Sequence, residues 1–325
     1  MRAAVCPSYG GPEVISLEEV PEPEPGPGEV RVAVKVAAVN FPDVLVAAGE
    51  YQIKVAPPFV LGSEYAGAVA AVGSGVTSVA VGDAVFGSAL VGAFAEQIVV
   101  PAGSVTQVPD GVSTDAAAGF GVGHRTAYHA LRSVAKLQPG EELIVLGAGG
   151  GVGLAAVQLG VVMGATVTAV ASSAEKLDAA KGCGATRLVN HRGTDLRAVL
   201  KEQLPEGADV VIDPVGGDLS EPSLRALHRG GRFVTVGYAS GVIPRIPLNL
   251  VLLKDIAIVG FEFRGWAMAN AAEMARNDTE LMSLLAEGRV TPYIGARFGF
   301  DHVVDAVRHV AEGKAIGKVL LDITA

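Results

Sequence analysis

Residues 143–153 read LIVLGAGGGVG and join a short apolar run to a glycine-rich turn. The apolar run 143–146 predicts a buried strand, and a helix is expected to begin near Gly153. Glycines in such a turn let the backbone approach a pyrophosphate, and the first N–H groups of the helix attract phosphate. The stretch therefore predicts a dinucleotide-binding turn rather than a purely structural one. Its expected contacts are Ala148, Gly149, Gly150, Gly151, Val152 and Gly153.

Strands and helices alternate after this turn. Helices are expected at residues 153–163, 174–181 and 195–203, between apolar strand candidates. This alternation is typical of a parallel, doubly wound α/β sheet. The strand candidates are residues 143–146, 166–170, 187–189, 210–213, 232–236 and 256–259.

The flanking segments have a different pattern. Before about residue 123, short valine-rich runs are separated by Gly, Pro and Asp, which predicts a compact β barrel or sandwich. After Gly265 we expect one helix at 267–287, a strand at 293–298, a helix at 301–312 and a last strand at 318–323. The valine-rich runs are residues 31–36, 66–72, 84–86 and 96–100.

Composition limits the class of protein. The chain has 325 residues, which favours two domains, and half of them are hydrophobic, which argues against disorder. A net charge of −9 without a basic block disfavours a nucleic-acid or anionic-membrane partner. No apolar run is long enough to span a membrane, and no signal-peptide pattern begins the chain. Two distant cysteines, Cys6 and Cys183, fit a reducing cytoplasm, which is the expected location.

The end of the second strand of the α/β part bears on the choice of dinucleotide. NAD sites usually carry an acid there for the ribose 2′-hydroxyl. This chain has Ser172 and Ser173, followed by Lys176. Hydroxyls and an ammonium suit a 2′-phosphate, so the sequence predicts NADPH as cofactor. The alternative is that Lys176 is a solvated helix residue and Glu175 reaches the ribose.

Several motifs occur in an order that resembles one family over essentially the whole chain. They are the zinc-independent quinone oxidoreductases of the medium-chain dehydrogenase/reductase superfamily. The motifs are residues 39–43 (VNFPD), 49–51 (GEY), 61–67 (LGSEYAG), 126–128 (TAY), 149–159 (GGGVGLAAVQL), 213–217 (DPVGG) and 317–320 (GKVL).

The resemblance implies an architecture of two domains. Residues 1–123 and 266–325 would form a GroES-like catalytic domain, and residues 124–265 a Rossmann-type NADPH-binding domain. Relatives commonly pair through the edge strand of the cofactor sheet, so residues 256–259 are expected at a homodimer interface.

The resemblance also predicts that no metal is bound. Zinc-dependent relatives carry a catalytic Cys where this chain has Asn40 and a His where it has Ser63. Amide and hydroxyl groups are poor zinc ligands beside thiolate and imidazole. Without a Lewis acid, the better substrate is one that already accepts hydride readily, such as a quinone or an activated alkene.

The family's site residues can be assigned only through matching positions. Asn40, Asp43 and Tyr51 are expected to line the active site, unless they are only turn and packing residues. Thr126 is expected to face the nicotinamide, with Val215 and Gly237 also beside the cofactor. Phe261 and Phe263 would frame the mouth or belong to the core. Lys176, His191 and Lys318 would surround the adenosine end, although His191 could equally be a solvated loop residue.

Three functions follow from these expectations. The first is an NADPH-dependent quinone reductase. The second is an NADPH-dependent reductase of activated C=C bonds in an enal, enone or enoyl thioester. The third is a non-catalytic NADPH-binding protein with a structural or regulatory role, because a fold does not fix a function.

Overall fold

The computed structural model describes residues 1–324 and divides the chain into two compact units. The first unit holds residues 1–122 and the C-terminal segment from Ile294 onward. The second holds Gly123–Tyr293. The chain therefore leaves the first unit once and returns to it near its end.

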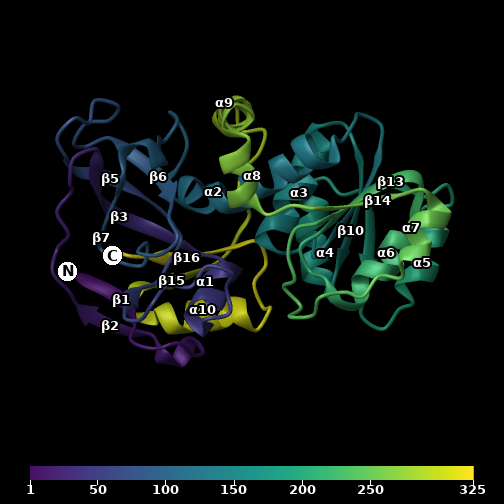
Figure 1. The fold of residues 1–325 in the computed structure, drawn as a ribbon, viewed down its shortest axis with the longest axis horizontal. Coiled ribbons are helices and arrows are strands. Elements are labelled where there is room, and N and C mark those ends of the chain that lie inside the picture. The colour runs from purple at the N-terminus through teal and green to yellow at the C-terminus, as the bar shows by residue number, and fades with distance from the viewer. Residues whose placement is uncertain (325) are drawn as a thin grey trace. The chain divides into compact units, whose positions relative to one another are not determined.

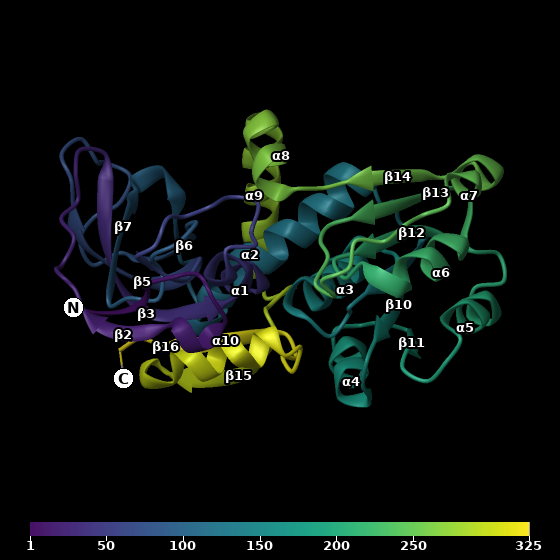
Figure 2. The same cartoon turned by 60° about the horizontal axis from the view of Figure 1, so that its bottom comes forward.

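The first unit is built mainly from antiparallel strands (Figures 1 and 2). Its larger sheet has the order β15-β16-β3-β5-β6-β8, with β7 paired to β3, and a small sheet has the order β2-β1-β4. The strands are β1 (Arg2–Cys6), β2 (Ser16–Glu19), β3 (Glu29–Val39), β4 (Phe59–Val60), β5 (Glu64–Val72), β6 (Ala84–Ser88), β7 (Gln97–Pro101), β8 (Val105–Gln107), β15 (Ile294–Gly299) and β16 (Lys318–Asp322).

Alternation along β3 explains the core of this unit. Val30, Val32 and Val34 are fully buried, and they pack with Leu61 and Phe94 in one hydrophobic cluster. The unit also contains the first part of α2 (Thr114–His129), two complete helices and three short 3₁₀ turns: α1 (Phe41–Ala48), α10 (Val303–Ala311), η1 (Pro12–Val14), η2 (Ala102–Ser104) and η5 (Phe300–His302).

The second unit contains the predicted parallel sheet. Its strand order, β11-β10-β9-β12-β13-β14, reverses direction beside β9, as in a doubly wound dinucleotide fold, and every pairing is parallel. All six strand predictions are confirmed, although the predicted strand 232–236 begins earlier, at Leu227, and the other ends shift by no more than two residues. The strands are β9 (Glu142–Leu146), β10 (Thr166–Ala171), β11 (Arg187–Asn190), β12 (Ala208–Asp213), β13 (Leu227–Thr235) and β14 (Ala257–Gly260).

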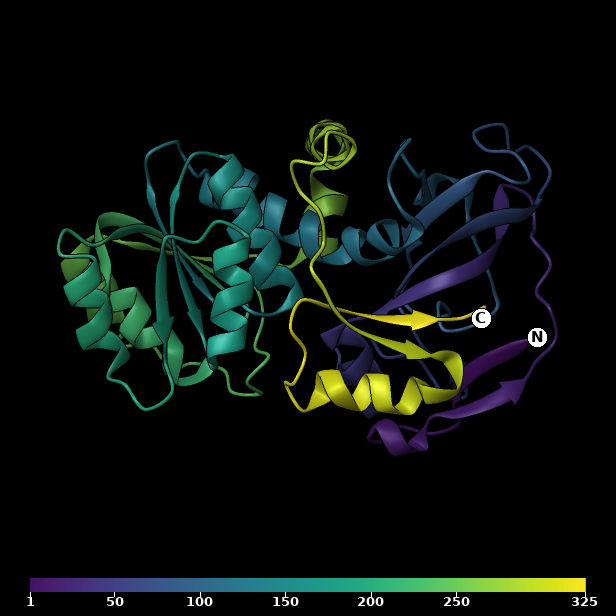
Figure 3. The same ribbon diagram turned by 180° about the vertical axis from the view of Figure 1, so that it is seen from behind.

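Helices cover both faces of this sheet. In Figures 1 and 3, α3 and α4 lie on one side and α5, α6 and α7 on the other. The three predicted helices are confirmed as α3, α4 and α5. The bounds are α3 (Gly151–Val162), α4 (Ala174–Gly182), α5 (Leu196–Gln203), η4 (Gly217–Leu219), α6 (Ser220–Arg225) and α7 (Leu248–Lys254).

Sequence analysis missed α2 (Thr114–His129), which continues into a π-helical turn at Ala130–Ala135. The division between the units falls inside this helix. Its glycines lower the intrinsic preference for helix. At Gly123, a Cβ would lie only 3.3 Å from the Gly151 carbonyl oxygen, so glycine allows a close approach to the start of α3.

The expected return to the first unit at residue 266 is too early, because residues 266–293 belong to the second unit. Asn277 explains this: its Nδ2 donates to His129 Nδ1 (3.2 Å) and Ser133 Oγ (2.9 Å). The expected single helix at 267–287 is also two helices, α8 (Phe263–Ala269) and α9 (Ala271–Ala286). They break at Asn270, whose N–H and side-chain amide both donate to the Trp266 carbonyl.

Candidate functional site

Three strands of the first unit bring polar residues to one place. In the larger sheet, β3 lies between β16 and β5, with Val39 opposite Val319 and Ala37 opposite Tyr65. The residues next to these partners are Asn40 after β3, Glu64 at the start of β5 and Lys318 at the start of β16. The register therefore gathers one amide, one carboxylate and one ammonium from distant parts of the sequence.

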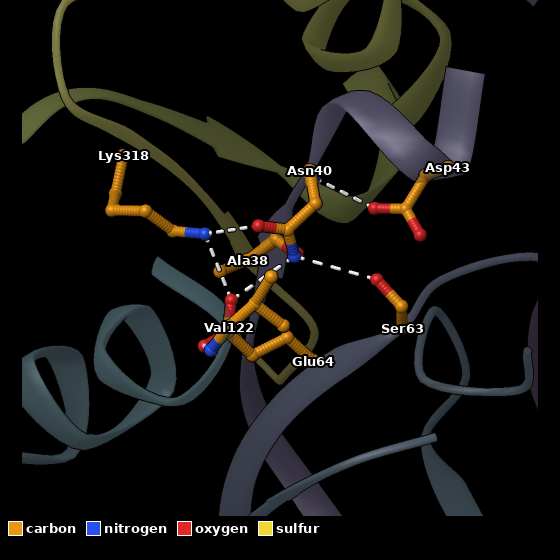
Figure 4. A network of polar contacts seen from close by, with 7 residues as sticks. All are labelled: Ala38, Asn40, Asp43, Ser63, Glu64, Val122 and Lys318. Atoms are coloured by element: carbon orange, nitrogen blue, oxygen red, sulfur yellow. Dashed lines mark hydrogen bonds and ion pairs between the residues drawn. The ribbon is translucent and has the colours of Figure 1, made fainter. Parts of the chain in front are cut away.

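These three side chains form a buried network (Figure 4). Lys318 Nζ donates to Asn40 Oδ1 and to Glu64 Oε2, the latter at 2.8 Å. Asn40 Nδ2 donates to the same Glu64 oxygen at 3.0 Å, and the Val122 N–H donates to Glu64 Oε1 at 2.7 Å. Glu64 is fully buried, and Lys318 and Asn40 are 4% and 8% exposed. The carboxylate is thus paired and hydrogen-bonded at both oxygens.

The network fixes the orientation of the Asn40 amide. Its oxygen accepts from the Lys318 ammonium, so its Nδ2 must face Glu64, Ser63 Oγ (3.4 Å) and the Ala38 carbonyl (3.2 Å). An amide nitrogen has two hydrogens, and these acceptors occupy both. Asn40 is therefore held by its neighbours, and a substrate contact from Nδ2 would compete with the Glu64 bond.

The structure groups Lys318 with other residues than the prediction did. Its ammonium is held by Asn40 and Glu64 in the first unit, whereas Lys176 and His191 belong to the second. Its contact with the adenosine end stays a prediction. Sequence analysis also missed the role of Glu64. The only signal was its place in the LGSEYAG motif.

Asp43 lies at the first turn of α1 and is 1% exposed. Its Oδ2 accepts the Asn40 N–H at 2.7 Å, which caps the helix from within. Burial raises the pKa of Asp43 to about 7, against the lowering effect of the bonds from Ser63 and Asn40. The structure therefore brings Asp43 together with Asn40. Tyr51, by contrast, packs half-buried against the hydrophobic cluster of this unit.

Replacing Asp43 by asparagine should flatten the pH dependence of stability. The raised pKa keeps the native carboxyl protonated up to about pH 7, whereas the unfolded carboxyl titrates near 3.8. Between these values the native state binds more protons, so the wild type loses stability as pH rises, by up to about 1.4 kcal/mol per pH unit. Urea unfolding from pH 4.5 to 7.5 measures the slope. An unchanged slope in Asp43→Asn would contradict the assignment, and the exposed Asp178→Asn is the control.

The glycine-rich turn of the second unit follows β9 as predicted. Gly147 has a positive φ of 60°, and a Cβ on Gly153 would lie 2.1 Å from the Gly147 carbonyl oxygen, so only glycine fits there. Helix α3 begins at Gly151 without a side-chain cap. The N–H groups of Gly151, Val152 and Gly153 therefore lack intrahelical partners, and this turn fits a pyrophosphate.

Basic side chains gather near the end of β10. Lys176 packs its aliphatic stem over the turn, since a Cβ on Gly149 would lie 2.5 Å from Lys176 Cβ. Burial and the charge of Arg192 lower the pKa of Lys176, and burial, Arg192 and Lys176 lower the pKa of His191. Lys176 and Arg192 thus carry like charges in one region beside the His191 imidazole, and an anion bound there would relieve their repulsion. Sequence analysis missed Arg192, which looks like an ordinary solvated residue.

Ser172 and Ser173 directly precede α4. Ser173 caps this helix, because its Oγ accepts the Lys176 N–H at 3.3 Å. Bonds from its own backbone and from Ser173 lower the pKa of Glu175. Glu175 is therefore engaged locally at the helix start, which weakens the alternative in which it reaches the ribose. Ser172 directly precedes this cap. Together with the nearby cations, this segment fits the 2′-phosphate of NADPH.

Val215 and Gly237 lie at the same edge of the sheet. A Cβ on Gly147 would lie 2.6 Å from Val215 Cγ2, and the Gly237 N–H donates to the Asp213 carbonyl at 3.4 Å. Asp213 shapes this loop and was not predicted: its Oδ1 accepts the N–H groups of Val215 and Gly216, both at 2.8 Å. The carboxyl ends of three neighbouring strands therefore line this region, as dinucleotide folds require.

The remaining cofactor candidates are less closely tied to the turn. Phe261 is 4% exposed and packs edge-to-face on Phe263 and Trp266, with ring centroids at 6.4 and 6.0 Å. The structure thus favours a core role for Phe261. Phe263 is half-buried beside His129. Thr126 is half-buried on α2, and its contact with a nicotinamide stays a prediction.

Across residues 1–324, no group of three or more His, Cys, Asp or Glu side chains is placed to hold a metal ion. The Glu64 carboxylate is already paired with Lys318 and hydrogen-bonded by the Asn40 amide, and Ser63, which is bonded to Asn40, offers only a hydroxyl. The same described residues include no helix that is both long and apolar enough to cross a bilayer.

Comparisons with known proteins agree with this arrangement. The family model of the alcohol dehydrogenase GroES-like domain matches residues 26–110, and that of the zinc-binding dehydrogenases matches residues 151–278. The chain is 38% identical to quinone oxidoreductase-like protein 2 of Bos taurus over 99% of this chain and 92% of that protein. It is 33% identical to the synaptic vesicle membrane protein VAT-1 homolog of Rattus norvegicus, over 99% and 84%.

A solved structure extends the likeness to three dimensions. The Escherichia coli quinone oxidoreductase complexed with NADPH superposes with a TM-score of 0.92 at 29% identity, over 99% of this chain and 100% of that one. The expected fold class, a GroES-like domain with a Rossmann-type parallel sheet, is thereby confirmed.

Proposed function

Since this chain belongs to the quinone oxidoreductase-like group of the medium-chain dehydrogenase/reductase superfamily, we propose that it is an NADPH-dependent quinone reductase that works without zinc. The observation that carries the proposal is the buried network of Glu64, Lys318 and Asn40. A zinc site needs several free anionic or nitrogen ligands. Here the one carboxylate of the network is committed to an ammonium and two N–H donors.

The residues of the second unit support NADPH as the cofactor. The turn at 147–153 suits the pyrophosphate, and Lys176, His191 and Arg192 suit the extra phosphate. Structures of similar proteins, among them the Escherichia coli enzyme, are complexed with NADPH. When bound, NADPH supplies a hydride, which is the two-electron donor that a quinone requires.

The chain itself has a limited chemical task in this reaction. A quinone that accepts a hydride becomes a hydroquinone monoanion, which is a weak base, so water can provide the second proton. No strong general acid is then needed. Lys318 Nζ gives two of its three hydrogens to Asn40 and Glu64, so the third can contact the acceptor, while Asn40 holds the ammonium in place. Asp43 holds the backbone of Asn40 in place through its hydrogen bond.

Anaerobic single-turnover oxidation of NADPH, followed at 340 nm with a panel of quinones, enones and enoyl thioesters, tests the proposal. We expect fast turnover with quinones in protein stripped of metal by a chelator. Turnover only with enones or thioesters would replace the quinone by an activated alkene. Tight NADPH binding without turnover of any acceptor would instead favour a structural or regulatory role.

We further propose that the protein is a homodimer that pairs through β14. This strand ends the six-stranded sheet, so no strand in the described part of the chain pairs with its outer backbone groups. Ile258 is 38% exposed on it, and Leu248, Leu252 and Leu253 of α7 are 66–80% exposed. Two copies related by a twofold axis could pair β14 edge to edge and cover these side chains.

Changing Leu252 and Leu253 together to glutamate should therefore dissociate the dimer, because paired carboxylates would be buried against each other. Sedimentation velocity at micromolar concentration measures the mass. The exposed Val81→Glu in the first unit serves as control and should leave the mass unchanged. A dimer that persists in the double variant would rule out this interface.

A further inference from the structure

A cavity of about 460 Å³ lies in the second unit, away from the glycine-rich turn. It is lined by α5, by the segment before β12, by the end of α6 with the first residues of β13, and by the last residue of α7. These strands run parallel to β9, so the cavity lies at the amino edge of the sheet, whereas the turn follows the carboxyl end of β9. Figure 2 shows α5, α6 and α7 gathered at this end. The cavity is therefore separate from the proposed cofactor site.

The lining of this cavity is strongly basic in a chain whose net charge is −9. Its one acidic residue is Glu206, against six basic residues: Arg197, Lys201, Arg225, His228, Arg229 and Lys254. Acids outside the lining pair with three of these. Arg225 pairs with Glu221 at 2.6 Å, His228 with Asp209 at 2.6 Å and Arg229 with Asp255 at 3.8 Å.

The other three cations have no such compensation. Arg197 and Lys201 lie one turn apart on α5, are exposed, and make no ion pair or side-chain hydrogen bond within residues 1–324. Lys254 Nζ donates to two neutral groups, the carbonyls of Arg225 and Leu227. An ammonium has three hydrogens, so one N–H remains for a ligand. The charges of Arg225 and Arg197 also lower the pKa of Lys254, after the larger effect of burial.

We propose that this cavity is a second anion site, which binds a small molecule carrying two or more phosphate groups. Guanidinium and ammonium donors recognise phosphate oxygens through charge-assisted hydrogen bonds. The cavity has the volume of a small-molecule site rather than that of a single ion. The uncompensated cations come from both α5 and α7, which suits a ligand with several separated charges. Free inorganic oligophosphate and a nucleoside diphosphate share this chemistry.

Calorimetric titration of the full-length protein with tripolyphosphate tests the site, in the presence of saturating NADP⁺ to fill the cofactor turn. We expect saturable binding that weakens as salt increases. Hydrogen exchange followed by mass spectrometry should show slower exchange on binding in residues 204–208 and 225–230, but not in residues 147–153. Protection confined to residues 147–153 would overturn the proposal, whatever the affinity.

A charge reversal with a matched control locates the site independently. Arg197→Glu with Lys201→Glu should weaken tripolyphosphate binding at least about tenfold while leaving NADPH binding unchanged. Lys35→Glu with Arg276→Glu changes the same charges at exposed positions outside the cavity and should have less than about a threefold effect. Equal weakening by the two double variants would overturn the site, because general charge would explain it.

Titrations with two further ligands, citrate and ADP, test which chemical class of molecule the cavity binds. Citrate binding as tightly as tripolyphosphate would overturn the assignment to phosphates. Tighter binding of ADP than of tripolyphosphate would support a nucleotide ligand, and the reverse order would support an inorganic oligophosphate. Because NADPH oxidation is measured separately, failure of the quinone reductase proposal would leave these results interpretable.

Discussion

Replacing Lys318 by methionine should lower the free energy of unfolding by about 3–5 kcal/mol, the usual cost of removing one partner of a buried ion pair. The change leaves the Glu64 carboxylate, which is fully buried, without its cation. Methionine keeps most of the stem of lysine, so lost packing contributes little. Urea unfolding with an unchanged m-value measures the loss.

Two variants separate this effect from simple loss of a lysine. Lys314 is exposed, lies four residues earlier in the chain, and within residues 1–324 forms an ion pair only with Glu312. Lys314→Met should therefore cost less than about 1 kcal/mol. Adding Glu64→Gln to Lys318→Met should recover part of the stability, because the buried charge is then gone. If Lys318→Met were as mild as Lys314→Met, the network would have no structural role.

The same variant tests the proposed function through the orientation of the Asn40 amide. Without the ammonium, Asn40 Oδ1 loses its donor, and the amide is free to rotate. We expect a fall in kcat for quinone reduction with little change in the affinity for NADPH, because the cofactor residues lie in the other unit.

The parallel sheet could be predicted from sequence because its signals are local. Each strand is a short apolar run, each helix has its own pattern, and the glycine turn marks the first crossover. Helix α2 could not be predicted in this way. Its Gly123 allows a close tertiary contact with the start of α3, and this need outweighs the low helix propensity of glycine.

The network around Glu64 depends on long-range register, which a single sequence does not contain. Glu64 and Lys318 are 254 residues apart and meet because β5 and β16 flank β3. A lysine at the start of a strand looks like a solvated residue, so nothing in the sequence indicated that Lys318 pairs with Glu64. The proximity of Asn40 and Asp43 was easier to predict from the sequence, because these residues cap one helix and lie three residues apart.

Changing Lys176 to methionine and Arg192 to glutamine should reverse the cofactor preference. Each cation can form a charge-assisted bond to a 2′-phosphate, worth about 1.5–3 kcal/mol, so kcat/KM for NADPH should fall at least about a hundredfold in the double variant. Methionine keeps the stem that packs over Gly149, so the turn itself should persist.

NADH provides the internal comparison for this variant, because it lacks the phosphate that the two cations would bind. Its kcat/KM should change less than about threefold. Lys181→Met, at an exposed position in the last turn of α4, should change neither value. If the double variant lost activity equally with NADH and NADPH, Lys176 and Arg192 would act on the turn and not on the 2′-phosphate. The preference for NADPH would then have to arise from other residues.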